Sequence, residues 1–310
     1  MSTVIGVDLG GTNIVGAVMK DGEIVEERKV PTEASKGAEH VLDNIASVVK
    51  ELLKVYPEIR KVGVGTPGAV AEDGTISGAY NIKGFHGTNL YDGLKNRLNQ
   101  DFTIIGGNDV DVAALGEYKF GSLPISKAMI CVALGTGIGG GLIINGSIFY
   151  GASGNALEVG HMVIKNNGRD CTCGRKGCFE TYGSATGIKR TFDEMLTPEA
   201  KSKLLDDKKI DEVTTKDIYD YAKDGDKFCL EVTEQVTKDL AVGIGNLVNI
   251  FNPDLIVIGG GVSLAGDFFF EPLSKALKDQ CFAKSYNTVK VVPSNLQDKA
   301  GIYGACALAL

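Results

Sequence analysis

Apolar residues recur along the chain in short runs and at helical spacing, separated by glycine-rich turns. Runs at 3–9 and 14–20 predict two strands, and a third strand is expected at 23–30. Helical spacing of apolar positions predicts a helix over 38–55, and KVGVGT predicts a strand over 61–66. The chain therefore opens with a three-stranded meander, followed by a helix and a strand.

The following residues continue this alternation. Residues 69–89 are rich in glycine and weakly patterned, which predicts a loop. A helix over 90–99, a strand over 102–106 and a helix over 110–121 are expected next. Strands that alternate with helices are typical of the α/β fold class.

A second round starts near residue 127 and repeats the opening plan. Apolar residues 128–134 predict a strand, the glycines of 135–141 predict a turn, and 142–151 predict the returning strand. This repetition indicates two related halves. The other elements expected here are helices within 188–240, a helix over 243–251, a strand over 254–261, a helix near 271–279, a strand over 289–292 and a last helix over 299–309.

Composition and charge narrow the class of protein. The 310 residues are 44% hydrophobic and 23% charged, which is typical of a globular protein of about two domains. The net charge of −7 does not favour nucleic acid as a partner, and no apolar run has the length of a membrane span. Seven cysteines, an odd number, fit a reducing compartment better than a disulfide framework. We therefore expect a cytoplasmic protein.

Four potential metal ligands cluster in the glycine-punctuated stretch 154–180. Three thiolates and one imidazole suit tetrahedral Zn²⁺, and four protein ligands would leave no open position, so the ion would be structural. The alternatives are a chance cluster, or one disulfide with a cysteine left over, but the density of ligands favours the metal. The predicted zinc ligands are His161, Cys171, Cys173 and Cys178.

Two acidic residues, Glu158 and Glu180, flank this cluster. Surface glutamates are common, and both side chains could simply be solvated. However, carboxylates accept hydrogen bonds from vicinal hydroxyls, and a zinc-bound His161 could donate one from its second ring nitrogen. This combination indicates a polyol substrate.

Three glycine-rich turns could hold a phosphorylated ligand. Residues 8–12 (DLGGT) join two predicted strands, so their amide groups could contact phosphate while Asp8 holds Mg²⁺. Alone, this turn could equally be an ordinary β-hairpin. The similar turn at 135–141 favours a phosphate clamp made by two hairpins, and the glycines of 259–261 could lie against adenine.

Asn108 and Asp109 follow a predicted strand and begin a helix. Both residue types are favoured helix N-caps, which is the simpler explanation of the pair. The alternative is a catalytic pair, in which Asp109 accepts the proton of an attacking hydroxyl and Asn108 orients the acceptor. The glycine turns and the zinc stretch elsewhere in the chain favour the catalytic interpretation.

Several short motifs together resemble the ROK family, which joins sugar kinases, chiefly bacterial glucokinases, to sugar-responsive repressors. They occur in the expected order along the chain. They are DLGGTN at 8–13, GVGTPG at 63–68, ND at 108–109 with AALGE at 113–117, LGTGIGGG at 134–141, EVGH at 158–161 and CTCGRKGCFE at 171–180.

The resemblance implies an actin-like, ribonuclease-H-like ATPase fold, with two α/β domains and a cleft for ATP and sugar between them. We expect a smaller N-terminal domain at 1–117, completed by the C-terminal helix at about 298–310. The larger domain, at 118–297, would contain the zinc stretch. The family also implies a homodimer.

The resemblance further implies roles for individual residues, with Asp109 as the catalytic base. The residues implied in sugar binding are Gly68, Asn81, Asn108, Asp109, Glu158, His161 and Glu180. Those implied in binding ATP and Mg²⁺ are Asp8, Gly10, Gly11, Thr12, Thr136, Gly137, Gly260 and Gly261.

Three positions depart from the family pattern. Asp111 stands where the family usually has asparagine, which adds a negative charge two residues from Asp109. Leu157 replaces the usual glycine before Glu158, and Asn155 is also atypical. We therefore expect the sugar loop to differ from that of its relatives.

The predicted function is ATP-dependent phosphorylation of a hexose, with glucose at its 6-hydroxyl as the first expectation. The enzyme alternatives are an N-acetylmannosamine kinase and a fructokinase. A sugar-sensing repressor would carry an N-terminal helix-turn-helix, whereas the first predicted strand here begins at Thr3. An actin- or chaperone-like ATPase without a small substrate would not need the zinc stretch and its flanking acids.

Overall fold

The computed structural model describes residues 3–99 and 101–310, whose contacts group the chain into two compact units. The first unit contains the described residues up to Ile125 together with Gly141–Ala156 and Asn295–Leu310. The second contains Ser126–Gly140 and Leu157–Ser294. Residues 141–156 thus group with the first unit, whereas the boundaries expected from sequence put them in the larger domain.

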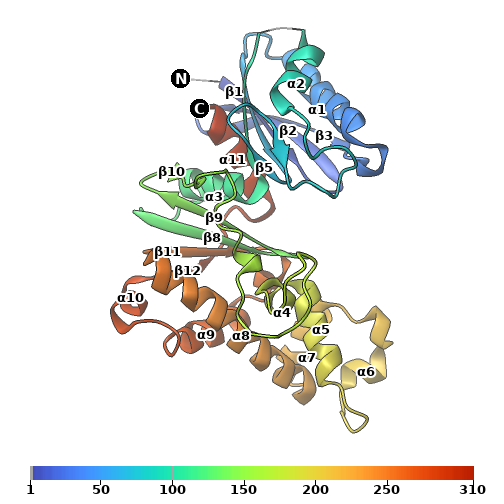
Figure 1. The fold of residues 1–310 in the computed structure, drawn as a ribbon, viewed down its shortest axis with the longest axis vertical. Helices are drawn as coiled ribbons and strands as arrows, with labels where there is room; N and C mark the ends of the chain where they lie inside the picture. The colour runs from blue at the N-terminus through green and yellow to red at the C-terminus, as the bar shows by residue number, and fades with distance from the viewer. Residues whose placement is uncertain (1–2, 100) are drawn as a thin grey trace. The chain divides into compact units, whose positions relative to one another are not determined.

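A five-stranded mixed sheet forms the centre of the first unit (Figure 1). β1, β2 and β3 pair as an antiparallel meander, as predicted, while β4 and β7 run parallel to β1. The strands are β1 (Thr3–Leu9), β2 (Asn13–Lys20), β3 (Glu23–Pro31), β4 (Lys61–Thr66) and β7 (Thr103–Asn108), in the order β3-β2-β1-β4-β7.

Helices cover both faces of this sheet. Neighbouring residues of a strand point to opposite faces, so the strands offer side chains to a helix on each side. α1 (Ala38–Leu53) packs on the face of Gly16, where an added Cβ would lie 2.2 Å from Val48. α11 (Ala300–Ala309), red in Figure 1, packs on the face of Gly6 beside β1 and β4, although it ends the chain.

Two further helices complete the first unit. α2 (Leu90–Leu98) packs against α1, and α3 (Asp109–Phe120) packs against α11. The predicted loop 69–89 is partly wrong, because it contains the short antiparallel strands β5 (Ala69–Val70) and β6 (Ile76–Ser77).

A second five-stranded sheet has the order β10-β9-β8-β11-β12, with β8, β11 and β12 parallel. The predicted turn 135–141 is shorter than expected, because β9 already begins at Ile138. Gly140 lies inside that strand, where an added Cβ would lie 2.8 Å from the Leu157 carbonyl oxygen. The strands are β8 (Ala128–Leu134), β9 (Ile138–Ile144), β10 (Ser147–Ile148), β11 (Leu255–Gly259) and β12 (Lys290–Pro293).

The second unit contains most of the helices. α8 is one long helix through both the 188–240 and 243–251 predictions, and it packs against α5, α7 and α9. None of the helices in the described residues has both the length and the apolar character that crossing a bilayer requires. The helices are α4 (Glu180–Gly183), α5 (Ala185–Met195), α6 (Lys203–Asp207), α7 (Thr215–Lys223), α8 (Lys227–Phe251), α9 (Asp267–Leu277) and α10 (Ala283–Thr288).

Candidate functional site

Asp8 and Asp109 interact electrostatically in the first unit, although they lie far apart in the sequence. Asp8 is near the end of β1, and Asp109 is the first residue of α3. Burial, and then the negative charge of Asp109, raises the pKa of Asp8 to about 6. Gly301 of α11 leaves room for the Asp8 carboxylate, since an added Cβ would lie 2.6 Å from Oδ2. Two neighbouring carboxylates of this kind suit a divalent cation.

Asn108 is the N-cap of α3, as the simpler explanation of the pair expects. Its Oδ1 accepts hydrogen bonds from the amides of Val110 at 3.0 Å and Asp111 at 3.5 Å. Its Nδ2 donates to the carbonyl oxygen of Gly68 at 3.4 Å. The cap therefore fixes Asp109 at the start of the helix and links it to a second predicted sugar residue. Asn81, also predicted to contact sugar, is exposed.

Thr32 forms two hydrogen bonds with the turn between β1 and β2. The Thr32 hydroxyl donates to the Gly10 carbonyl oxygen at 2.6 Å, and its amide donates to the Thr12 carbonyl oxygen at 2.9 Å. Gly11 and Thr12 are exposed, and an added Cβ on Gly11 would meet no atom within 4 Å. The turn is thus open to a ligand. Sequence reasoning missed Thr32, since its role arises only from the fold.

Asp111, one of the three departures from the family pattern, is 3% exposed in α3. Burial, and then the charge of Asp111, raises the pKa of Tyr150 to about 12. Tyr150 therefore stays protonated at neutral pH and remains a hydrogen-bond donor near this carboxylate.

The four predicted zinc ligands converge in the second unit. Their ligand atoms all lie within 4.8 Å of one another, with 3.7 Å between Cys171 Sγ and His161 Nδ1 and 3.6 Å between Cys173 Sγ and Cys178 Sγ. Ligands about 2.3 Å from a tetrahedral Zn²⁺ are about 3.8 Å apart, so the donor set and its spacing fit this ion. Nδ1 of His161 faces the cluster, which leaves Nε2 for another contact.

Glycine turns and backbone hydrogen bonds shape this Cys₃His cluster. Gly177 has φ of +77°, and an added Cβ would lie 1.7 Å from the Lys165 carbonyl oxygen. The backbone N–H of Arg175 lowers the pKa of Cys173 to about 6, whereas burial raises that of Cys178 to about 12. Zn²⁺ binds cysteine as the thiolate, so metal binding would release protons from those ligands that are still thiols.

Glu180 and Glu158 differ in their surroundings. Glu180 is the first residue of α4, and its Oε2 accepts a hydrogen bond from the Ile138 amide at 2.9 Å. Gly137 makes this possible, because an added Cβ there would lie 2.3 Å from the same oxygen. Glu158 is exposed and follows Leu157, whose φ of +57° is in the left-handed region.

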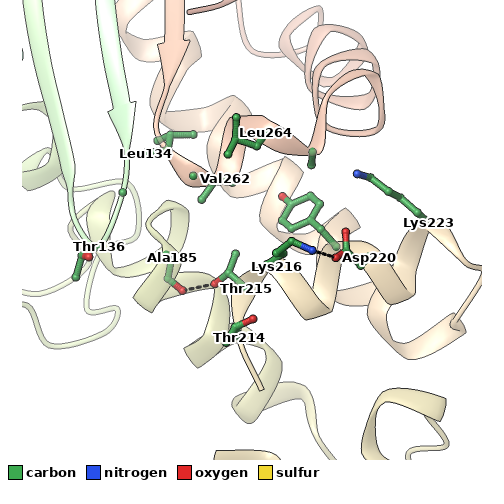
Figure 2. Close-up of a pocket in the computed structure, with 14 residues that line it drawn as sticks. Leu134, Thr136, Ala185, Thr214, Thr215, Lys216, Asp220, Lys223, Val262 and Leu264 are labelled. Atoms are coloured by element: carbon green, nitrogen blue, oxygen red, sulfur yellow. Dashed lines mark hydrogen bonds and ion pairs between the residues drawn. The ribbon is translucent and has the colours of Figure 1, made fainter. Parts of the chain in front are cut away.

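A cavity of about 450 Å³ lies within the second unit (Figure 2). Leu134, Val262 and Leu264 form one side, and residues of α7, including Lys216, face them. The cavity brings together Thr136 and Gly261, two of the residues predicted to bind nucleotide. Gly260 packs closely against the neighbouring Leu134. Its φ is +86°, and an added Cβ would lie 2.3 Å from the Leu134 carbonyl oxygen.

The α7 wall of this cavity was not predicted. A capping box between Thr214 and Asp217 starts α7, and this four-residue pattern is visible in the sequence. Tyr219 lines the same wall and is 4% exposed. Within 3–99 and 101–310, no group forms a hydrogen bond with its hydroxyl.

Comparisons with known proteins agree on one family. The sequence profile of the ROK family matches residues 4–310. A glucokinase of Halalkalibacterium halodurans is 37% identical, over 97% of this chain and 92% of its own. The xylose repressor of Caldicellulosiruptor bescii is 28% identical, over 100% of this chain and 78% of its own.

A solved structure gives the same result for the fold. The ROK family glucokinase from Streptomyces griseus, in complex with glucose and AMPPNP, has a TM-score of 0.81 to this chain and is 31% identical, with 99% of each chain covered. The predicted two-domain α/β fold of the actin-like ATPase type is therefore confirmed.

Proposed function

Because this chain belongs to the ROK family, we propose that it is an ATP-dependent hexose kinase that phosphorylates the 6-hydroxyl of glucose. The resemblance seen in the sequence motifs is confirmed by the family profile. The observation that carries the proposal is that Asp109 begins α3 and its charge acts on the buried carboxylate of Asp8 near the end of β1, which lies against Gly301 of α11. A proton acceptor and a potential cation ligand are thereby held on two rigid elements.

In the proposed reaction, Asp109 accepts the proton of the attacking hydroxyl while the γ-phosphoryl group transfers. Asn108, Gly68, Asn81, Glu158, His161 and Glu180 bind and orient the sugar. The turns at Gly10–Thr12 and Thr136–Gly137 bind the phosphates, and Gly260 and Gly261 contact the adenosine in the cavity of the second unit. Asp8 would hold Mg²⁺, which when bound neutralises charge on the phosphates.

We also propose that the Cys₃His cluster holds one structural Zn²⁺, since its four donor atoms all lie within 4.8 Å of one another. The ion would fix the loop that carries Glu158 and His161. Metal analysis of purified protein should find one zinc per chain.

The direct test is the pair Asp109→Asn and Asp111→Asn, measured by ADP release across a panel of hexoses. Asp109→Asn should lower kcat by about 10²–10⁴-fold while glucose still binds, because only the proton acceptor is lost. Asp111→Asn is the matched control on the same helix, and it restores the residue usual in the family. Full turnover in Asp109→Asn would contradict the assignment.

The hexose panel also separates the alternatives. A kinase for N-acetylmannosamine or fructose would turn over those sugars in preference to glucose. The similarity to a xylose repressor supports a non-enzyme alternative, a sugar-responsive repressor. Such a protein would bind sugar without sugar-dependent consumption of ATP.

Assembly and domain organisation are part of the same proposal. We expect a cytoplasmic homodimer whose chains have domains at 1–117 with about 298–310, and at 118–297. Light scattering on the purified protein measures the subunit number.

A further inference from the structure

Arg169 has a largely buried side chain whose five N–H groups all have acceptors. Its side chain is 9% exposed. Nη1 donates to the carbonyl oxygens of Thr181 at 2.6 Å and Gly187 at 3.1 Å. Nε and Nη2 donate to the Glu194 carboxylate at 3.0 and 2.7 Å, and Nη2 also donates to Thr191 Oγ1 at 2.9 Å. One side chain therefore joins α4, α5 and the loop that precedes them.

The backbone of Arg169 lies in the loop that carries the cysteines of the Cys₃His cluster. Arg169 lies two residues before Cys171, and its carbonyl oxygen accepts a hydrogen bond from the Gly177 amide at 2.8 Å. Its own amide donates to the Tyr182 hydroxyl at 2.9 Å, and its guanidinium lies 4.4 Å from the centre of that ring. A movement of the loop that carries these cysteines would therefore also move the backbone from which the Arg169 side chain extends.

The helices that Arg169 holds contact the Gly135–Gly137 turn at three points. The Ala185 amide donates to the Gly135 carbonyl oxygen at 2.9 Å. The Thr186 hydroxyl donates to the Thr136 carbonyl oxygen at 2.9 Å. Third, the Glu180 carboxylate accepts from the amide that follows Gly137, as described above. A turn of two glycines and a threonine has little side chain to fix it, so these contacts set its conformation.

We propose that Arg169 is a positioning residue that couples the Cys₃His cluster to the nucleotide-phosphate turn through α4 and α5. The inference rests on the proposed function, which assigns Gly135–Gly137 to phosphate binding. A turn held in its binding conformation loses less freedom when the nucleotide binds, and this raises affinity. Arginine is required because its planar fork reaches two backbone carbonyls and a carboxylate together, whereas lysine offers one ammonium group.

The test compares Arg169→Lys with Arg190→Lys, with Mg·ATP binding measured by calorimetry without sugar. Arg190 is the matched control because its Nε also donates to Glu194, at 2.9 Å, but its side chain is 42% exposed. Neither Thr181 nor Gly187 accepts a hydrogen bond from it in the described residues. We expect Arg169→Lys to weaken ATP binding by about three- to tenfold per lost contact, with zinc content unchanged, and Arg190→Lys to bind like wild type.

A second pair of variants tests the contact between α5 and the Gly135–Gly137 turn and leaves Arg169 unchanged. Thr186 is exposed, so Thr186→Ala should fold normally yet weaken ATP binding by about three- to tenfold, and Thr186→Ser should restore it. The KM for hexose should not change in either variant. In the double variant with Arg169→Lys, the two effects should be less than additive, because both act through the α4–α5 junction.

The outcomes separate the two proposals. Wild type that binds ATP but phosphorylates no hexose contradicts the kinase proposal and leaves the binding comparison valid. Active wild type whose ATP affinity is unchanged by both Arg169→Lys and Thr186→Ala contradicts the coupling alone. Loss of ATP affinity only when zinc is also lost would contradict the role of the Arg169 side chain, and wild type that binds no nucleotide contradicts both.

Discussion

Leu157 holds a backbone conformation that leucine rarely adopts, directly before a predicted sugar-binding residue. Its φ of +57° brings the Cβ atom close to the neighbouring carbonyl, which costs about 1–2 kcal/mol for any residue with a side chain. The resemblance to the ROK family implies a glycine at this position. Leu157 therefore adopts a backbone conformation that suits glycine, and the resulting backbone strain lies directly before Glu158.

Glycine should consequently be better than alanine at position 157. Leu157→Gly and Leu157→Ala both delete the side chain, but only the first removes the Cβ atom. We expect Leu157→Gly to be more stable than Leu157→Ala by about 1 kcal/mol, the reverse of the usual order. Urea denaturation of the two variants measures this difference, and the usual order would contradict the strain.

The raised pKa of Asp8 predicts a pH dependence of stability in the protein without magnesium. The folded-state pKa of about 6 lies above the ordinary value of 3.8, so the folded protein binds this proton more tightly than the unfolded chain. Its contribution to the free energy of unfolding is therefore largest below pH 3.8 and is lost as the pH rises through 6. Between pH 5 and 7, wild type should lose about 1 kcal/mol relative to Asp8→Asn. A change of opposite sign would contradict burial as the cause.

Among the elements, α3 and α11 approach each other backbone to backbone. An added Cβ on Gly304 of α11 would lie 1.7 Å from the Val112 carbonyl oxygen, and one on Gly116 of α3 would lie 2.3 Å from the Ala300 carbonyl oxygen. This close contact holds the helix that begins with Asp109 against the helix that packs on Asp8. Small residues in the last helix therefore help to determine where Asp109 lies relative to Asp8.

An alanine at Gly304 should force these two helices apart. We expect Gly304→Ala to lower the free energy of unfolding by about 2–3 kcal/mol, because backbone on the opposing helix cannot yield as a flexible side chain could. Gly11→Ala is the control in the same unit, since an added Cβ there meets no atom within 4 Å. Thermal unfolding of both variants measures the difference, and equal melting temperatures would contradict this view of the packing.

At the scale of the whole molecule, the proposed chemistry is divided between two units. Asp8 and Asp109 belong to the first, whereas the Cys₃His cluster and the 450 Å³ cavity belong to the second. The metal ligands all lie between His161 and Cys178, so the ion would stabilise only the second unit directly.

Chelation of the metal should therefore act unequally on the two units. Removal of zinc should lower hydrogen-exchange protection over about 157–195 and leave the sheet of β1, β2 and β4 protected, because metal binding is coupled to folding only where the ligands lie. The melting temperature of the second unit should fall and recover when zinc is added back. A uniform loss of protection across both units would show that they do not respond independently.

By itself, the sequence determined the alternation of strands and helices, the Cys₃His ligand set and the family, because periodicity and short ligand spacings are local properties of the chain. It misplaced features that depend on close packing: the glycines of 135–141 resembled one long turn, yet Gly140 lies inside β9 because backbone passes beside it.

Only the tertiary structure decided that the charge of Asp109 acts on Asp8, that Glu180 accepts a hydrogen bond from the Ile138 amide and that α7 lines the cavity. Each of these contacts joins residues that are distant in the chain. Their approach depends on how helices pack on the sheets, and no local pattern of residue types encodes that packing.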